Sequence, residues 1–224
     1  MKQELSPRQK QILYYLAQEQ IESFEPVASI QIKEKYHLDF STATIRHELF
    51  ELCQMEYLEQ PHISAGRILS DMGWEILISD FLGNTLVDNN DFDLSNDYDQ
   101  FAQDLSQRTQ SMSIVFDWKN NKIYKKGISF LLNERIIDNI QEMSIVSNII
   151  DEIDNKLEKL KDTLFDKEIN VYVGHNNPLF KNQYLAFIGT KSDKDKLIIA
   201  IITPKVTSYE EHFKLFGQLI NTLN

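Results

Sequence analysis

Forty consecutive residues in the middle of this chain, from Ile68 to Gln107, contain nine Asp or Glu residues and no Lys or Arg. The net charge is −3 before this segment and +1 after it, so the segment supplies nine of the eleven net negative charges of the 224-residue chain. Its centre, LVDNNDFDLSNDYDQ, is rich in Asn and Asp and lacks sustained apolar periodicity, which is typical of a linker. The sequence therefore predicts two unlike domains, residues 1–83 and 98–224, joined by an acidic linker at residues 84–97.

Composition excludes several classes of protein. The chain has one cysteine, Cys53, so it has no disulfide framework and no cysteine-based zinc site, and we expect this thiol to belong to the core. The start of the chain lacks the apolar stretch of a signal peptide, and the longest strongly apolar run, LIIAII, is far too short to span a bilayer. We therefore expect a cytoplasmic protein with no membrane partner.

The first 70 residues carry signals for helices followed by a hairpin. Ser6-Pro7 begins a first helix that ends before Pro26. A short second helix is expected at residues 29–36, with Ile30 facing inward. Ser41 caps a third helix, whose buried stripe is Ile45, Leu49 and Leu52.

Two strand-compatible segments follow the third helix, at residues 57–60 and 67–69, and a turn containing Pro and Gly joins them. Helices followed by a hairpin in this order predict a winged helix-turn-helix domain. In such a domain the third helix enters the major groove of DNA and the hairpin lies beside the phosphate backbone.

Side chains suited to DNA binding lie at the start of the third helix and on the hairpin. Hydroxyl groups donate to phosphate oxygens, and a helix N-terminus adds positive potential. We predict that Arg46 contacts guanine, that His47 contacts a base edge or a phosphate, and that Arg67 contacts a phosphate; the bland alternative is that these side chains are solvated surface. The candidate DNA-binding residues are Ser41, Thr42, Thr44, Arg46, His47, His62, Ser64 and Arg67.

The second half predicts an α+β domain with a largely antiparallel sheet. Apolar residues at helical spacing indicate a helix that begins at Tyr98, and the segments SIVFDW, INVYVG, YLAFIG and KLIIAIIT indicate strands. A longer stripe, from Ile149 to Leu164, indicates a helix that packs on this sheet, and Tyr209 to Leu223 indicates a closing helix.

Nothing in the sequence indicates an enzyme. The five histidines have no metal-ligand spacing, and the chain has no phosphate-binding glycine loop and no nucleophile motif. His175 is best interpreted as a turn residue. We expect no catalytic residues, no metal and no cofactor.

The strings FEPVASIQIKEKYHLDFSTATIRHEL and EYLEQPHISAGRILSDMGW resemble the heat-inducible transcription repressor HrcA family, and weaker matches continue through the second half. The resemblance implies that STATIRHEL is the recognition helix, that YLEQPHISAGRI is the wing, and that the second domain is GAF-like. It also implies a shortened member that lacks the inserted dimerising domain, because only DWKNNK stands where that domain occurs.

The resemblance implies a repressor of chaperone genes that takes part in the heat-shock stress response. It would act as a homodimer on an inverted repeat in double-stranded DNA, with a chaperonin as a further partner. Two alternatives stay open: a regulator whose GAF-like domain binds a small molecule, and a protein-interaction adaptor that has lost DNA binding. Because Glu48 and Glu51 lie on the recognition helix, we expect modest, salt-sensitive DNA affinity that depends on dimerisation.

Overall fold

The computed structural model describes residues 4–84, 97–132, 140–177, 179–180 and 184–223. The chain divides into two compact units, residues 1–83 and 84–224. Most of the expected acidic linker, residues 85–96, lies outside the described residues. No helix in the described part of the chain is both long enough and apolar enough to cross a membrane.

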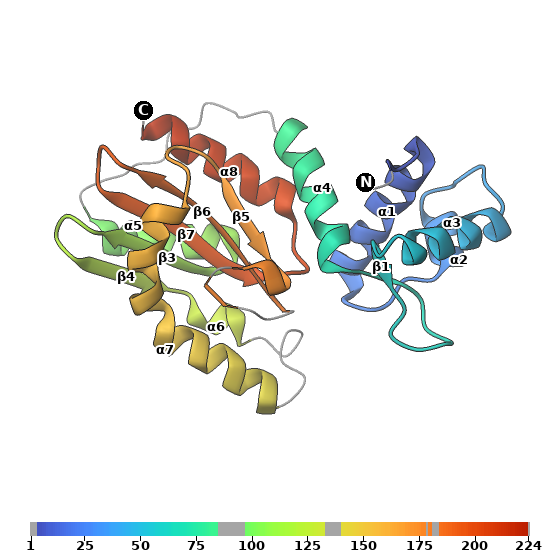
Figure 1. The fold of residues 1–224 in the computed structure, drawn as a ribbon, viewed down its shortest axis with the longest axis horizontal. Helices are drawn as coiled ribbons and strands as arrows, with labels where there is room; N and C mark the ends of the chain where they lie inside the picture. The colour runs from blue at the N-terminus through green and yellow to red at the C-terminus, as the bar shows by residue number, and fades with distance from the viewer. Residues whose placement is uncertain (1–3, 85–96, 133–139, 178, 181–183, 224) are drawn as a thin grey trace. The chain divides into compact units, whose positions relative to one another are not determined.

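The first unit contains helices and one small hairpin (Figure 1). Its elements are α1 (Pro7–Ser23), α2 (Ser29–Lys35), α3 (Thr42–Gln54), β1 (Leu58–Glu59), β2 (Ile68–Leu69) and α4 (Asp71–Asn84). β1 and β2 are antiparallel and pair Leu58 with Leu69. The predicted order of three helices followed by a hairpin is therefore observed, and an unpredicted helix, α4, follows it.

α1 begins as the sequence predicts. The Ser6 hydroxyl accepts a hydrogen bond from the backbone N–H of Gln9 (3.2 Å), and the Gln9 side chain accepts one from the backbone N–H of Ser6 (3.0 Å). This reciprocal pair satisfies two amides that have no partner within the helix. The helix ends at Phe24, which adopts a left-handed backbone conformation (φ 60°) two residues before Pro26.

The prediction that Ile30 faces inward is wrong. Ile30 is 44% exposed, whereas Ile32 is fully buried in α2. Residues two positions apart in an α-helix point about 200° apart, so only one of these two side chains can face the core. The packing of α2 against α1 and α3 buries Ile32. The sequence of a seven-residue helix is too short to show which of its sides is buried.

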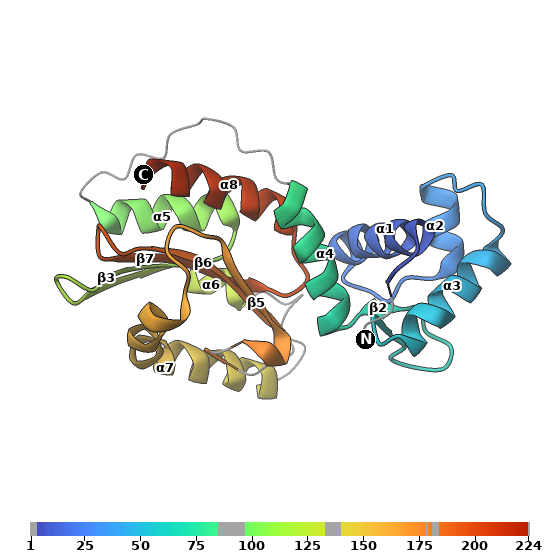
Figure 2. The ribbon, with the colours of Figure 1, turned by 45° about the horizontal axis from the view of Figure 1, so that its top comes forward.

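The second unit is a five-stranded antiparallel sheet covered by helices on both faces, as Figure 2 shows. The strand order is β4-β3-β7-β6-β5. The strands are β3 (Met112–Asp117), β4 (Lys122–Lys126), β5 (Asn170–Val173), β6 (Leu185–Ser192) and β7 (Leu197–Pro204). The helices are α5 (Tyr98–Thr109), α6 (Ile128–Leu131), α7 (Ile140–Thr163), the 3₁₀ turn η1 (Gly174–Asn176) and α8 (Tyr209–Thr222).

α5 and α8 lie along one face of the sheet, and α6 and α7 lie along the other (Figure 2). The predicted stripe on α7, which includes Ile153, Leu157 and Leu160, packs with Ile114 of β3 and Phe187 of β6 in one apolar core. Because both faces are covered, the central strand β7 is apolar along nearly its whole length. The predicted α+β class with an antiparallel sheet is confirmed.

β4 and α6 were not predicted. β4 is an edge strand with the sequence KIYKK, and its lysines obscure the alternation by which strands are recognised. Cys53, expected in the core, is only half-buried.

Candidate nucleic-acid interface

α3 buries one face and exposes the opposite, mainly polar face, on which Phe50 is also 54% exposed. Ile45 and Leu52 are fully buried and Leu49 is nearly so, whereas Arg46 and His47 are exposed. This division follows the predicted stripe. An exposed polar face on a helix of 13 residues provides a surface that a groove of DNA can receive.

The start of α3 carries three hydroxyl groups. The Ser41 hydroxyl accepts a hydrogen bond from the backbone N–H of Thr44 (3.0 Å), and the two side-chain oxygens lie 2.8 Å apart. Thr42 is the first residue of the helix and is half-exposed. Ser41 is therefore the helix cap, and its contact with a DNA phosphate stays a prediction.

The arginines of the first unit differ in what holds their side chains. Arg8 donates to the carboxylate of Glu48 at 3.1 Å. The Nε of Arg67 donates to Cys53 Sγ, also at 3.1 Å. Arg46 is exposed and has no hydrogen-bond or ion-pair partner among the residues that the structure describes. Of these three arginines, Arg46 is therefore the one whose guanidinium is available to a ligand.

The two carboxylates of α3 face α1. Glu48 is 8% exposed and its charge is paired with Arg8. Glu51 accepts a hydrogen bond from the side-chain amide of Gln9 (3.2 Å) and lies 3.3 Å from His47 Nε2. Arg8 therefore offsets the charge of Glu48, so this carboxylate opposes DNA less than its position on α3 suggests, whereas the Gln9 amide that bonds Glu51 carries no charge.

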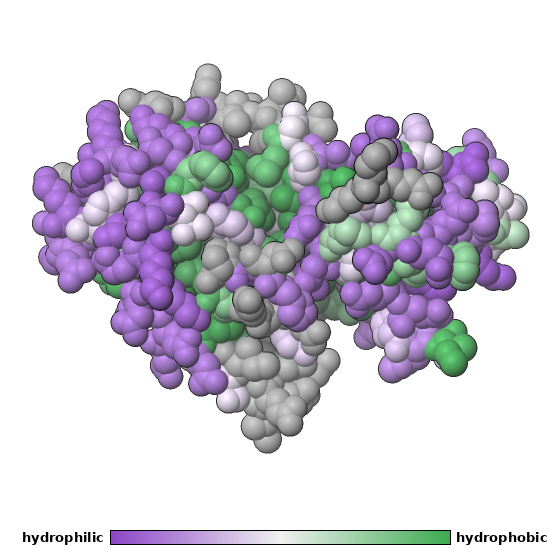
Figure 3. All heavy atoms as spheres, in the orientation of Figure 1, coloured by the Kyte–Doolittle hydropathy of each residue, from purple (hydrophilic) through white to green (hydrophobic). Residues whose placement is uncertain are grey.

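The loop between β1 and β2, residues 60–67 (the hairpin loop), is organised by its own hydrogen bonds. The side-chain amide of Gln60 donates to the carbonyls of Ile63 (2.9 Å) and Ala65 (3.1 Å), and the Ala65 N–H donates to the His62 carbonyl (2.9 Å). His62, Ile63 and Ser64 are exposed. Figure 3 shows a hydrophobic projection at this loop on an otherwise mainly hydrophilic surface of the first unit.

The base of the hairpin loop is anchored to the segment before α2. Val27 and Arg67 exchange two backbone hydrogen bonds of 2.8 Å. A Cβ atom on Gly66 would overlap the backbone of Val27, so glycine is required here by the approach of two protein segments.

Arg67 holds the hairpin loop from within. Besides its bond to Cys53, its Nη1 donates to the carbonyls of Ala65 and Gly66, each at 3.3 Å. A guanidinium with these partners is not free to leave for a phosphate without breaking them. Its predicted contact with phosphate stays a prediction, and the structure gives this side chain an internal role instead.

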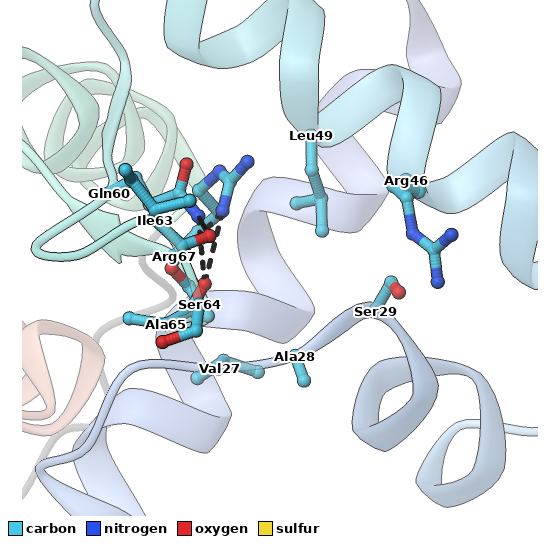
Figure 4. A pocket seen from close by; sticks show the side chains of 11 residues that line it. Val27, Ala28, Ser29, Arg46, Leu49, Gln60, Ile63, Ser64, Ala65 and Arg67 are labelled. Carbon is cyan, nitrogen blue, oxygen red and sulfur yellow. Dashed lines mark hydrogen bonds between the residues drawn. The ribbon is translucent and has the colours of Figure 1, made fainter.

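A cavity of about 340 Å³ lies between α3, the start of α2 and the hairpin loop, as Figure 4 shows. Of the predicted site residues it brings together Arg46, Ser64 and Arg67, and it leaves out the others. Ser29 and Gln60 also line it, and the sequence predicts neither as a site residue. Neither stands in a recognisable motif, and only the meeting of the three segments places them together.

The histidines of the second unit do not form a metal-binding site with other described side chains. His175 is exposed in η1, a 3₁₀ turn, as its turn assignment predicted. His212 on α8 is buried, its Nε2 lies 3.0 Å from the Thr207 hydroxyl, and burial lowers its pKa to about 4. Among the described residues, no three His, Cys, Asp or Glu side chains are grouped so that they could hold a metal ion.

A crystal structure of a hypothetical protein has the same fold. It matches 98% of this chain and 96% of its own with a TM-score of 0.78, at 18% sequence identity. An identity this low supports the fold alone.

Curated relatives share sequence with this chain. The heat-inducible transcription repressor HrcA of Synechococcus sp. (strain JA-3-3Ab) is 46% identical over 88 residues, which are 39% of this chain and 22% of the relative. The repressor of the same name from Clostridioides difficile (strain 630) is 26% identical over 231 residues, which cover 99% of this chain and 65% of the relative. The chain thus spans less than two thirds of the length of these relatives.

The family model described as the HrcA protein C terminal domain matches residues 41–212. The match begins at the cap of α3, includes the hairpin, and continues to α8 in the second unit. Since it extends over well more than half of the 224 residues, the chain belongs to the HrcA family.

Proposed function

We propose that this protein is a sequence-specific, DNA-binding transcriptional repressor of chaperone genes. The first unit would act as a winged helix domain, with α3 in the major groove and the hairpin loop as its wing. The observation that carries this proposal is the exposed face of α3, where His47 is exposed and Arg46 has no partner among the described residues, beside a hairpin loop organised by its own hydrogen bonds. The names of the curated relatives support the regulatory role.

The protein would act as a homodimer on an inverted repeat. Two-fold symmetry would present two α3 helices to half-sites separated by whole turns of DNA, about 34–36 Å per turn. Bound there, the dimer would block polymerase. A cytoplasmic location and a response to a chaperonin belong to the same proposal.

The two alternatives receive no specific support. A ligand sensor needs a pocket in the second unit, and the described core there contains fully buried apolar side chains such as Ile153, Leu157 and Phe187. The adaptor alternative rests on the acidic excess of the chain, nine of whose eleven net negative charges lie in residues 68–107 and so mostly outside the three helices and hairpin of the first unit.

Selection of bound duplexes from a random DNA pool, followed by gel-shift titration, tests the proposal. We expect the wild-type protein to prefer the selected inverted repeat over a scrambled duplex, and to protect two half-sites in footprinting. His47→Ala should reduce this preference by about 1–3 kcal/mol, because the variant cannot hydrogen-bond to a base edge. Equal affinity for selected and scrambled DNA would refute the sequence-specific repressor, and no binding even at low salt would favour the adaptor.

A further inference from the structure

The cavity beside α3 is lined by residues whose charge is opposite to that of the chain as a whole. Of its eleven lining residues, two are arginines and none is acidic, although the chain carries a net charge of −11. A ligand for this cavity is therefore expected to be an anion.

The polar groups of the cavity come from three segments that converge. Figure 4 shows the Arg46 guanidinium extending from α3 toward the Ser29 hydroxyl, with Ser64 on the hairpin loop across from them. A guanidinium beside a hydroxyl is a pair that binds phosphate oxygens, and Ser64 faces this pair from the opposite wall. The volume of about 340 Å³ is roughly ten times the share of one water in the liquid, about 30 Å³, and so admits a phosphate group with solvent.

We propose that this cavity binds one phosphate of the DNA backbone, with Arg46 as its cation, Ser29 as a hydroxyl donor beside it and Ser64 on the opposite wall. The inference rests on the proposed DNA binding and changes the role of Arg46 from reading guanine to positioning the duplex. Phosphate contacts of this kind fix the register of a protein on DNA and carry no sequence information themselves.

The geometry of α3 favours this role for Arg46. Leu49, three residues after Arg46, lines the same cavity, so this side of the helix faces the hairpin loop. His47 is exposed, lies about 100° further round the helix and does not line the cavity. Base reading would therefore fall to His47 and its neighbours.

The walls of the cavity are held in place before any ligand arrives. The backbone bonds between Val27 and Arg67 join the loop to the start of α2, and Gln60 closes the loop from within. A site that needs little ordering on binding loses less free energy to immobilisation.

The test compares variants on two duplexes, the selected inverted repeat and a scrambled sequence, over a series of salt concentrations. Arg46→Ala should weaken binding to both by the same factor, about tenfold, because the variant cannot make the charge-assisted hydrogen bond to phosphate. The slope of log affinity against log salt should fall by about 0.9 for each phosphate that the variant no longer neutralises. Ser29→Ala and Ser64→Ala should weaken both affinities less and leave the slope unchanged.

Lys119→Ala is the charge-matched control, because this exposed lysine lies in the turn between β3 and β4 of the other unit. It should leave both affinities unchanged. Circular dichroism and thermal unfolding of each variant establish that it folds. The wild-type protein should bind more weakly to a duplex with a neutral methylphosphonate at the contacted position. The Arg46→Ala variant should bind the modified and the unmodified duplex with the same affinity.

Two results would overturn the inference. If Arg46→Ala weakens only the selected duplex, then Arg46 reads a base, and the repressor proposal survives without the phosphate site. If inorganic phosphate, titrated without DNA at constant ionic strength, saturably shifts the amide resonances of Ser29 and Ser64 while Arg46→Ala leaves the affinity for both duplexes unchanged, the cavity binds a free anion and not DNA. A wild-type protein that does not prefer the selected duplex contradicts the proposed function itself.

Discussion

Replacing Arg67 by Ala tests whether this residue shapes the hairpin loop or binds DNA. The substitution removes three side-chain hydrogen bonds, to Cys53 Sγ at 3.1 Å and to the carbonyls of Ala65 and Gly66 at 3.3 Å. It keeps the backbone bonds to Val27, which do not involve the side chain. The expected change is therefore local to the loop and its contact with α3.

The magnitude follows from the number and length of these bonds. A hydrogen bond of ordinary geometry contributes about 0.5–1.5 kcal/mol net, and bonds of 3.3 Å or to sulfur belong at the weak end. Three such bonds on a half-buried side chain give a loss of about 1–3 kcal/mol in the free energy of unfolding of the first unit.

The chain has two tryptophans, and only Trp74 lies in the first unit, where it is fully buried. In a Trp118→Phe background, the fluorescence of Trp74 during urea unfolding therefore reports on that unit alone. Arg46→Ala is the matched control, because it truncates an exposed arginine with no partner among the described residues and should change stability by less than about 0.5 kcal/mol. The internal role of Arg67 is refuted if Arg67→Ala leaves stability unchanged and weakens binding to all DNA sequences alike, which is the behaviour of a residue that contacts phosphate.

Three further predictions concern single groups. Ser41→Ala should lower stability by about 1 kcal/mol through loss of the cap bond to Thr44, measured by the same unfolding assay, whereas Ser41→Asp should keep the cap but weaken DNA binding by repelling phosphate. Glu48→Gln should change DNA affinity by less than about twofold, because Arg8 already pairs with this buried carboxylate, and a tenfold gain in a gel-shift titration would show that its charge does reach DNA. Burial lowers the pKa of His212 to about 4, so between about pH 6.5 and pH 4 the imidazole of His212 stays neutral in the folded protein. In the unfolded chain the same imidazole takes up a proton below about pH 6.5. Stability should therefore fall as the pH drops from about 6.5 toward 4, by roughly 2 kcal/mol at about pH 5, and a His212→Gln variant with the same pH profile as the wild type would contradict this.

Most elements were predictable because their signals are local. The cap at Ser6, the stripe on α3, and the apolar strands β6 and β7 all depend on residues only a few positions apart. β4 escaped prediction because an edge strand rich in lysine lacks apolar alternation. The side of α2 that faces the core was mispredicted, because seven residues are too few to define a face.

The candidate site was predictable in its residue types and not in their roles. The presence of polar and basic side chains on α3 and on the hairpin loop follows from the sequence. The folded chain shows in addition that Arg8 is paired with a carboxylate 40 residues away, that Arg67 is bonded to Cys53, and that Arg46 has no partner among the described residues. The reason is physical: periodicity and capping act over single turns, whereas the partner of a charged side chain is set by segments that meet only when the chain folds.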